Sequence, residues 1–113
     1  MKAQVLHKYD PDLSSGNWVS LENVEDPKIQ KANDVIIRIG GAGVCRTDLH
    51  IVEGIWMPHM DPDGKSLLPL IMGHENAGWI EEIGPEVEGF SVGDPVIVHP
   101  KITGGTCLAC RRG

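Results

Sequence analysis

The sequence has little basic charge, few cysteines and no long hydrophobic run, and each shortage excludes a class of protein. The 113 residues carry a net charge of −6, and the largest Lys/Arg cluster is the pair Arg111-Arg112. A nucleic-acid partner is therefore disfavoured, because phosphate binding needs a basic patch. No apolar stretch approaches the length of a membrane span or of a signal-peptide core. We therefore predict a cytoplasmic protein without a membrane partner.

The sequence also has few cysteines and lacks familiar nucleotide-binding motifs, and both shortages exclude further classes of protein. The three cysteines form an odd number that matches a secreted disulfide framework poorly, and reduced thiols are candidates for metal binding or reactivity. The stretch GGAGV comes close to the G-x-G-x-x-G fingerprint, but Arg46 occupies the position of its last glycine. The sequence has no phosphate-loop motif and no G-x-S-x-G elbow. These residues therefore show no dinucleotide-binding fingerprint.

The composition that is present is that of an ordinary globular domain. Hydrophobic residues make up 41% and charged residues 23% of the 113 residues, enough for one domain with a modest core. The 14 glycines and 8 prolines, with short Val/Ile runs, favour strands and turns. We expect a mainly β fold, a small barrel or sandwich forming one domain over residues 1–113. Strands are predicted at 2–7, 18–25 and 34–43, within 68–84 with interruptions at Gly73 and Gly78, and within 90–100.

One short helix is predicted at residues 45–54. Cys45, Leu49 and Val52 recur at the spacing of one helix face, and Gly54 is a suitable C-terminal stop. The stretch that follows, 56–66, has the composition of an irregular loop.

The first group of candidate site residues consists of Cys45, His74 and Glu75. Zinc prefers thiolate and imidazole ligands, with carboxylate as a third option. At the first turn of the predicted helix, the positive end of the helix dipole would favour the metal-binding thiolate of Cys45. His74 and Glu75 are adjacent, so both can serve one metal only if the backbone turns at Gly73 or one of them acts from outside the ligand shell. The alternative is that Cys45 is a small buried hydrophobe and His74 an ordinary core histidine.

Two residue pairs with a spacing of three form a second group on the predicted helix. Thr47 and His50 would be neighbours, and a hydroxyl beside an imidazole can pass a proton from a buried site to solvent. Asp48, three residues after Cys45, could accept the second N–H of a metal-bound imidazole. The alternative is a polar helix face whose N-terminal Asp is favoured by the dipole.

The third group is the pair Cys107-x-x-Cys110. It can present two thiolates to one tetrahedral metal, but a closed structural zinc site needs four ligands. A redox-active pair is the competing interpretation, although the βαβ pattern that usually surrounds such a pair is not evident.

Three stretches, GVCRTDLH (43–50), GHENAGWIEEIG (73–84) and VGDPVIV (92–98), together resemble the N-terminal catalytic domain of the zinc-dependent medium-chain alcohol dehydrogenases. The resemblance covers nearly the whole chain and implies a GroES-like, partly open β-barrel with one or two short helices. It implies a catalytic zinc bound by Cys45 and His74, with Glu75 as an occasional ligand. It further implies that Asp48 is a partner of the zinc site and that Thr47 and His50 form a proton relay. It also implies that Thr47 and Trp56 bind the substrate. Arg46 and His50 are the implied cofactor-binding residues.

The resemblance also implies a reaction and an assembly. An alcohol is oxidised to an aldehyde or ketone, or the reverse, through zinc Lewis-acid activation and hydride transfer to NAD or NADP. Relatives that resemble this chain are commonly homodimers or homotetramers. Two alternatives are a non-catalytic GroES-like or zinc-binding module and a zinc-free relative of the quinone reductases. The relay beside Cys45 argues against the first, and Cys45 and His74 argue against the second.

Two departures from the family pattern limit these expectations. Gly104 stands where the family has the first of four structural cysteines, whereas the second and third match Cys107 and Cys110. We therefore do not expect a complete four-cysteine zinc site, and two alternatives are a metal-free lobe and a lobe that recruits another ligand. The chain also stops before the third catalytic ligand and the Rossmann cofactor domain, so we expect an incomplete domain that does not turn over substrate alone.

Overall fold

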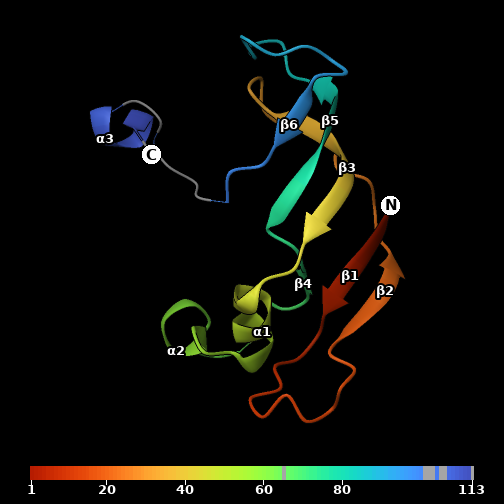
Figure 1. Ribbon diagram of the computed structural model, residues 1–113, viewed down its shortest axis with the longest axis vertical. Helices are drawn as coiled ribbons and strands as arrows, with labels where there is room; N and C mark the ends of the chain where they lie inside the picture. The colour runs from red at the N-terminus through yellow and green to blue at the C-terminus, as the bar shows by residue number, and fades with distance from the viewer. Residues whose placement is uncertain (65, 101–103, 105–106, 113) are drawn as a thin grey trace.

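The computed structural model describes residues 1–64, 66–100, 104 and 107–112, and in these ranges the chain forms six strands and three short helices (Figure 1). The strands make two antiparallel three-stranded sheets, ordered β2-β1-β4 and β3-β5-β6. The mainly β prediction is confirmed, and both sheets stay open within the described ranges. The elements are β1 (Lys2–Leu6), β2 (Val19–Asn23), β3 (Val35–Gly43), α1 (Arg46–Glu53), α2 (Met57–Met60), β4 (Leu70–Ile71), β5 (Glu75–Ile83), β6 (Pro95–Ile97) and α3 (Leu108–Arg112).

The first sheet is built around β1. This strand pairs with β2 from Lys2↔Asn23 to Leu6↔Val19, and its other edge pairs with β4 at Val5↔Ile71. Its apolar side chains are buried, as expected of a central strand that covers a core. The buried apolar residues of the described chain are Ala3, Val5 and Leu6 of β1, Val52 of α1 and Ile80 of β5.

The second sheet brings the two candidate metal-binding stretches together. β3 and β5 pair from Val35↔Ile83 to Gly43↔Glu75, so the end of β3 that leads into α1 lies beside the start of β5. The prediction that Gly78 interrupts this strand is wrong, because β5 continues through it. A Cβ at Gly78 would collide with the Arg38 carbonyl of β3, so glycine permits the close approach of the two strands.

Gly73, in contrast, does separate two strands as predicted. Its φ of 108° is in the region that favours glycine, and it lies between β4 and β5. This turn places His74 directly before β5.

The helices differ in part from the expectation. α1 ends as predicted at Gly54, whose φ of 73° is left-handed. The loop predicted at 56–66 is wrong at Met57–Met60, which form the single turn α2 with Pro58 at its start, where no backbone N–H is needed. The third helix, α3, lies in the cysteine lobe, whose other residues (101–103, 105–106 and 113) fall outside the described ranges. None of the described helices is both long and apolar enough to cross a bilayer.

Candidate metal centre

Cys45 caps the N-terminus of α1. Its backbone is extended (φ −127°, ψ −178°), and its Sγ accepts a hydrogen bond from the Thr47 N–H at 3.3 Å. The Cys45 N–H in turn donates to Asp48 Oδ2 at 2.8 Å. The two bonds form a reciprocal capping box, a role that Ser or Thr and Glu more often fill. The start of the helix therefore fixes the direction of the Cys45 sulfur.

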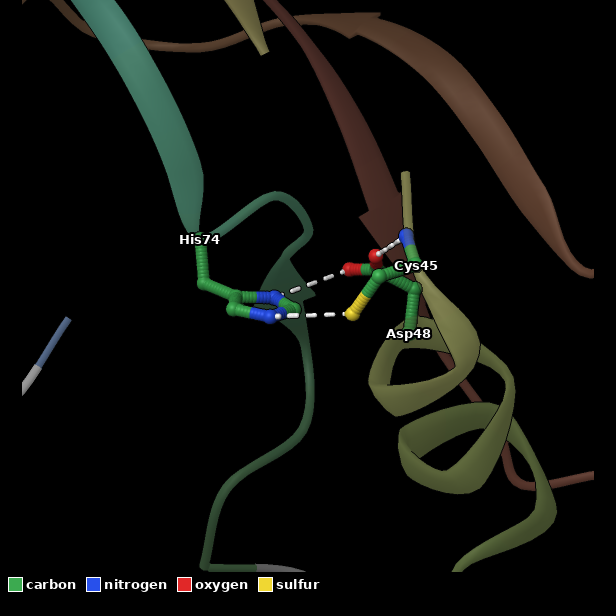
Figure 2. A group of neighbouring side chains, drawn as sticks. All are labelled: Cys45, Asp48 and His74. Carbon is green, nitrogen blue, oxygen red and sulfur yellow. Dashed lines mark hydrogen bonds and ion pairs between the residues drawn. The ribbon is translucent and has the colours of Figure 1, made fainter. Parts of the chain in front are cut away.

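His74 reaches the same point from the segment before β5. Its Nε2 lies 3.4 Å from Cys45 Sγ, and its Nδ1 lies 3.2 Å from Asp48 Oδ1 (Figure 2). The side chains of His74 and Asp48 are 28% and 11% exposed, so solvent weakens the interaction between the ring and the carboxylate only partly. Asp48 thus contacts both other residues, the backbone of Cys45 with one carboxylate oxygen and the ring of His74 with the other.

The carboxylate of Asp48 determines which nitrogen of His74 is available. An anionic oxygen beside Nδ1 favours the tautomer that carries the proton there. The Nε2 lone pair then faces Cys45 Sγ, as it would in a metal-bound imidazole oriented by a carboxylate. The same two atoms can also share an S–H···N hydrogen bond.

The donor atoms fit zinc. Bonds of about 2.3 Å to sulfur and about 2.0 Å to nitrogen, at a tetrahedral angle, place the two ligand atoms about 3.6 Å apart. The observed separation of Cys45 Sγ and His74 Nε2 is 3.4 Å. Potential ligand atoms of Cys45, Asp48 and His74 all lie within 4.8 Å of one another. Two protein ligands of this kind leave coordination positions open for a further ligand and a substrate.

Glu75 lies outside this group. It is the exposed first residue of β5, and its carboxylate lies against Gly43 on the paired strand. This is the outcome expected when adjacent residues enter a strand and point to opposite faces. Its role as an occasional ligand stays a prediction.

The candidate relay residues are half-buried on α1, but no hydrogen bond between described residues joins Thr47 to His50. Instead, His50 Nδ1 lies 2.9 Å from Glu53 Oε2. The His50 ring also packs at 68° to Trp56, with ring centroids 6.1 Å apart. Sequence reasoning missed Glu53, although its spacing of three from His50 is the signal that singled out the other helix pairs. The relay stays a prediction, with Glu53 as the residue that holds its imidazole.

Two further candidate residues flank the relay residues Thr47 and His50 in the sequence. Arg46, the first residue of α1, is exposed and has no ion-pair partner among the described residues. Trp56 borders an apolar cavity of about 270 Å³, a size that suits part of a small ligand. The cavity is lined by Tyr9, His50, Ile51, Gly54, Trp56, Met57, Met60, Leu67 and Leu70.

The pair Cys107 and Cys110 lies at the start of α3. The sulfurs of Cys107 and Cys110 are 3.1 Å apart, and the Cys110 N–H donates to Cys107 Sγ at 3.4 Å. This N–H, aided by the Cys110 thiol, holds the pKa of Cys107 below its ordinary value. Among the described residues, no His, Cys, Asp or Glu completes a group of three around these sulfurs. The residues present therefore do not fit a four-cysteine zinc site.

Comparison with known proteins places the chain in a family. The alcohol dehydrogenase GroES-like domain family matches residues 31–113. The NAD-dependent alcohol dehydrogenase of Sulfolobus acidocaldarius is 38% identical over 113 residues, which cover 100% of this chain and 30% of that protein. The D-arabinose 1-dehydrogenase (NADP⁺) of Saccharolobus solfataricus is 42% identical over 112 residues, covering 99% of this chain and 28% of that protein.

A solved structure shows the same relationship. The alcohol dehydrogenase of the hyperthermophilic archaeon Aeropyrum pernix is 49% identical and matches with a TM-score of 0.80, covering 100% of this chain and 30% of that one. The chain thus spans 30% or less of the length of these relatives. The GroES-like fold implied by the three sequence stretches is confirmed, and the chain belongs to the alcohol dehydrogenase GroES-like domain family.

Proposed function

We propose that the chain is the metal-binding part of the catalytic domain of a zinc-dependent alcohol dehydrogenase. The complete enzyme would oxidise an alcohol to an aldehyde or ketone, or catalyse the reverse, and exchange hydride with NAD or NADP. The observation that carries the proposal is the convergence of Cys45 Sγ and His74 Nε2, with Asp48 on the other ring nitrogen. The names of the two relatives support it, because one is an NAD-dependent and the other an NADP-dependent dehydrogenase.

Each residue of the centre has a separate task in this proposal. Cys45 and His74 hold the metal, and Asp48 keeps the imidazole in the tautomer that can bind it. When bound there, zinc supplies Lewis-acid chemistry that lowers the pKa of a substrate hydroxyl. The capping bonds to Thr47 and Asp48 hold the thiolate ligand in place, so little reorganisation is needed on binding.

Proton release to solvent is the task proposed for Thr47 and His50. Both lie on α1, the helix that Cys45 caps, and the His50 side chain is 30% exposed. Because Glu53 Oε2 faces Nδ1, the proton on that nitrogen is held and Nε2 is left as the acceptor. A proton taken from the substrate side can therefore leave through a partly exposed ring.

The cavity beside Trp56 supports a small substrate with an apolar carbon skeleton. The exposed guanidinium of Arg46 would contact the cofactor pyrophosphate, for which its fork of N–H donors is suited. As the family resemblance implies, we expect the complete enzyme to be a homodimer or homotetramer. A cytoplasmic location stays the expectation drawn from the sequence. The relative named for D-arabinose shows that sugars belong among the substrates to be assayed beside simple alcohols.

Zinc content per chain tests the proposal. Wild type, Cys45→Ser and the matched control Cys107→Ser are loaded with zinc, desalted and measured by elemental analysis. In the complete enzyme, which supplies the further ligand, wild type and Cys107→Ser should each retain about one zinc per chain, and Cys45→Ser should retain almost none. Zinc that survives Cys45→Ser but is lost in Cys107→Ser would place the metal in the cysteine lobe and favour the non-catalytic binding module.

A further inference from the structure

Cys107 and Cys110 bring two thiols together at the start of α3. Figure 1 shows this helix set apart from α1, whose N-terminus Cys45 caps. The Cys107 and Cys110 sulfurs are 3.1 Å apart, whereas a disulfide bond is about 2.05 Å long. Closing the bond therefore requires the sulfurs to approach by about 1 Å. Both belong to one short segment, so neither sheet has to move.

The two thiols differ in access. Cys107 is exposed, and Cys110 is half-buried. The Cys110 N–H points at Cys107 Sγ at 3.4 Å and stabilises negative charge on that sulfur. An exposed sulfur with such a donor suits the attacking role in thiol–disulfide exchange, and a shielded neighbour suits the resolving role.

The described part of the lobe offers no third ligand that would make this pair a zinc site. No His, Cys, Asp or Glu joins the two sulfurs in a potential metal-binding group within the described residues. At Gly104, where the family has a cysteine, an added Cβ would meet no atom within 4 Å. With respect to the described residues, the position is therefore open.

We propose that Cys107 and Cys110 form a redox-active dithiol that closes a reversible disulfide. The Cys107 thiolate attacks a small-molecule disulfide such as oxidised glutathione, forms a mixed disulfide and releases one glutathione thiolate. Cys110 then loses its proton and attacks the Cys107 sulfur, which releases the second glutathione. The protein gives up two electrons and two protons, and the reagent takes them up as two thiols. A dithiol reductant reverses the step.

Peptide mapping tests the proposal without interference from Cys45. Cleavage after Lys101 and Arg111 yields a peptide, residues 102–111, that contains both lobe cysteines. After treatment of the wild type with oxidised glutathione, this peptide should lack two hydrogen atoms and carry no glutathione. Cys110→Ser should stop at a glutathione adduct on Cys107, because the resolving thiol is gone. Stable glutathione adducts in the wild-type peptide, or two unreacted thiols, would overturn the proposal.

A zinc-protection experiment separates the dithiol from a metal site. Zinc is added to the wild type and to Gly104→Cys before oxidation, and the same peptide is measured. The wild-type peptide should oxidise equally with and without zinc, whereas Gly104→Cys gains a third thiolate and should be protected. Protection of the wild-type peptide by zinc would contradict the proposal. Either result stands independently of the Cys45 centre, which lies on other elements.

Discussion

The two cysteine sites of this chain differ in how their partners are assembled. Cys45 meets His74, which is 29 residues away, through the pairing of β3 with β5 and the capping of α1. Cys107 meets Cys110 within one turn of α3. The first site joins a sulfur and a nitrogen atom that are oriented by Asp48, and the second joins two sulfurs.

This difference indicates different chemistry. A metal centre needs several ligands held at set distances, and in this chain the sulfur and the nitrogen ligand come from segments far apart in the sequence. A dithiol needs only two sulfurs that can approach each other and a reagent, so local geometry suffices. The metal centre should therefore respond to substitutions on three elements, and the thiol pair should not respond to them.

Of the variants considered, His74→Ala is expected to have the largest effect on zinc binding at the metal centre. It removes the nitrogen donor and leaves Cys45 as the one thiolate of the centre, so zinc affinity should fall by about 100-fold or more. Competition with a chromogenic chelator measures the affinity. His59→Ala, at an exposed histidine of α2, is the matched control and should bind zinc as the wild type does. Equal affinity for the two variants would contradict the account.

A smaller loss is expected from Asp48→Asn. The amide keeps the shape of the side chain but removes the charge that fixes the His74 tautomer, so zinc affinity should drop about 10–100-fold. The helix content measured by circular dichroism should stay unchanged, because the amide oxygen can still accept the Cys45 N–H. The exposed Asp12→Asn serves as control. An unchanged affinity would show that Asp48 is a helix cap alone.

Glu53→Ala should alter His50 without altering zinc binding. The variant removes the acceptor at 2.9 Å from Nδ1, so the Nδ1–H tautomer should lose about tenfold in population relative to the Nε2–H form, as for a charge-assisted hydrogen bond of about 1.5 kcal/mol. Long-range ¹H–¹⁵N NMR of the imidazole reads the tautomer directly. If the ratio stays the same, the helix and Trp56 orient His50 without Glu53.

Lowering the pH should have the smallest effect of these perturbations. It acts on the carboxylates of Asp10 and Asp61, which lie outside α3. Donation from the Ser15 N–H lowers the pKa of Asp10 from 3.8 to about 2. Burial alone would raise the pKa of Asp61, but hydrogen bonds from the Ser66 N–H and the Tyr9 hydroxyl bring it from 3.8 to about 2. Both folded-state values lie below the unfolded ones, so the stabilisation is present above about pH 4 and is lost as the pH falls through about 2.

Urea unfolding followed by tryptophan fluorescence measures this loss. The midpoint should stay constant from about pH 7 to about pH 4 and fall below that, and the fall should be shallower in Asp61→Asn. A midpoint that is independent of pH in this range would show that these carboxylates contribute no net stability.

The sequence predicted the parts of this molecule that depend on neighbours along the chain. The span of β3, the helix after Cys45 and its end at Gly54 follow from β-branched runs, periodicity and the freedom of glycine at positive φ. The single turn α2 was missed, because four residues around a proline carry no periodic signal.

The parts that depend on distant contacts were predicted less well. Gly78 has the local signature of an interruption, and only the approach of the Arg38 backbone explains why β5 continues through it. Whether His74 or Glu75 faces Cys45 also depends on the pairing of β3 with β5, so adjacency in the sequence left both possible. The meeting of Cys45, Asp48 and His74 was inferred from chemistry and resemblance, and the distances required the structure.

X-ray absorption at the zinc edge tests the central claim most directly, because it counts sulfur neighbours of the bound metal. The account predicts one sulfur at about 2.3 Å, from Cys45, with nitrogen and oxygen neighbours at about 2.0–2.1 Å, in both the wild type and Cys107→Ser. A shell of two sulfurs that disappears in Cys107→Ser would contradict it, because the metal would then lie between the thiols of α3.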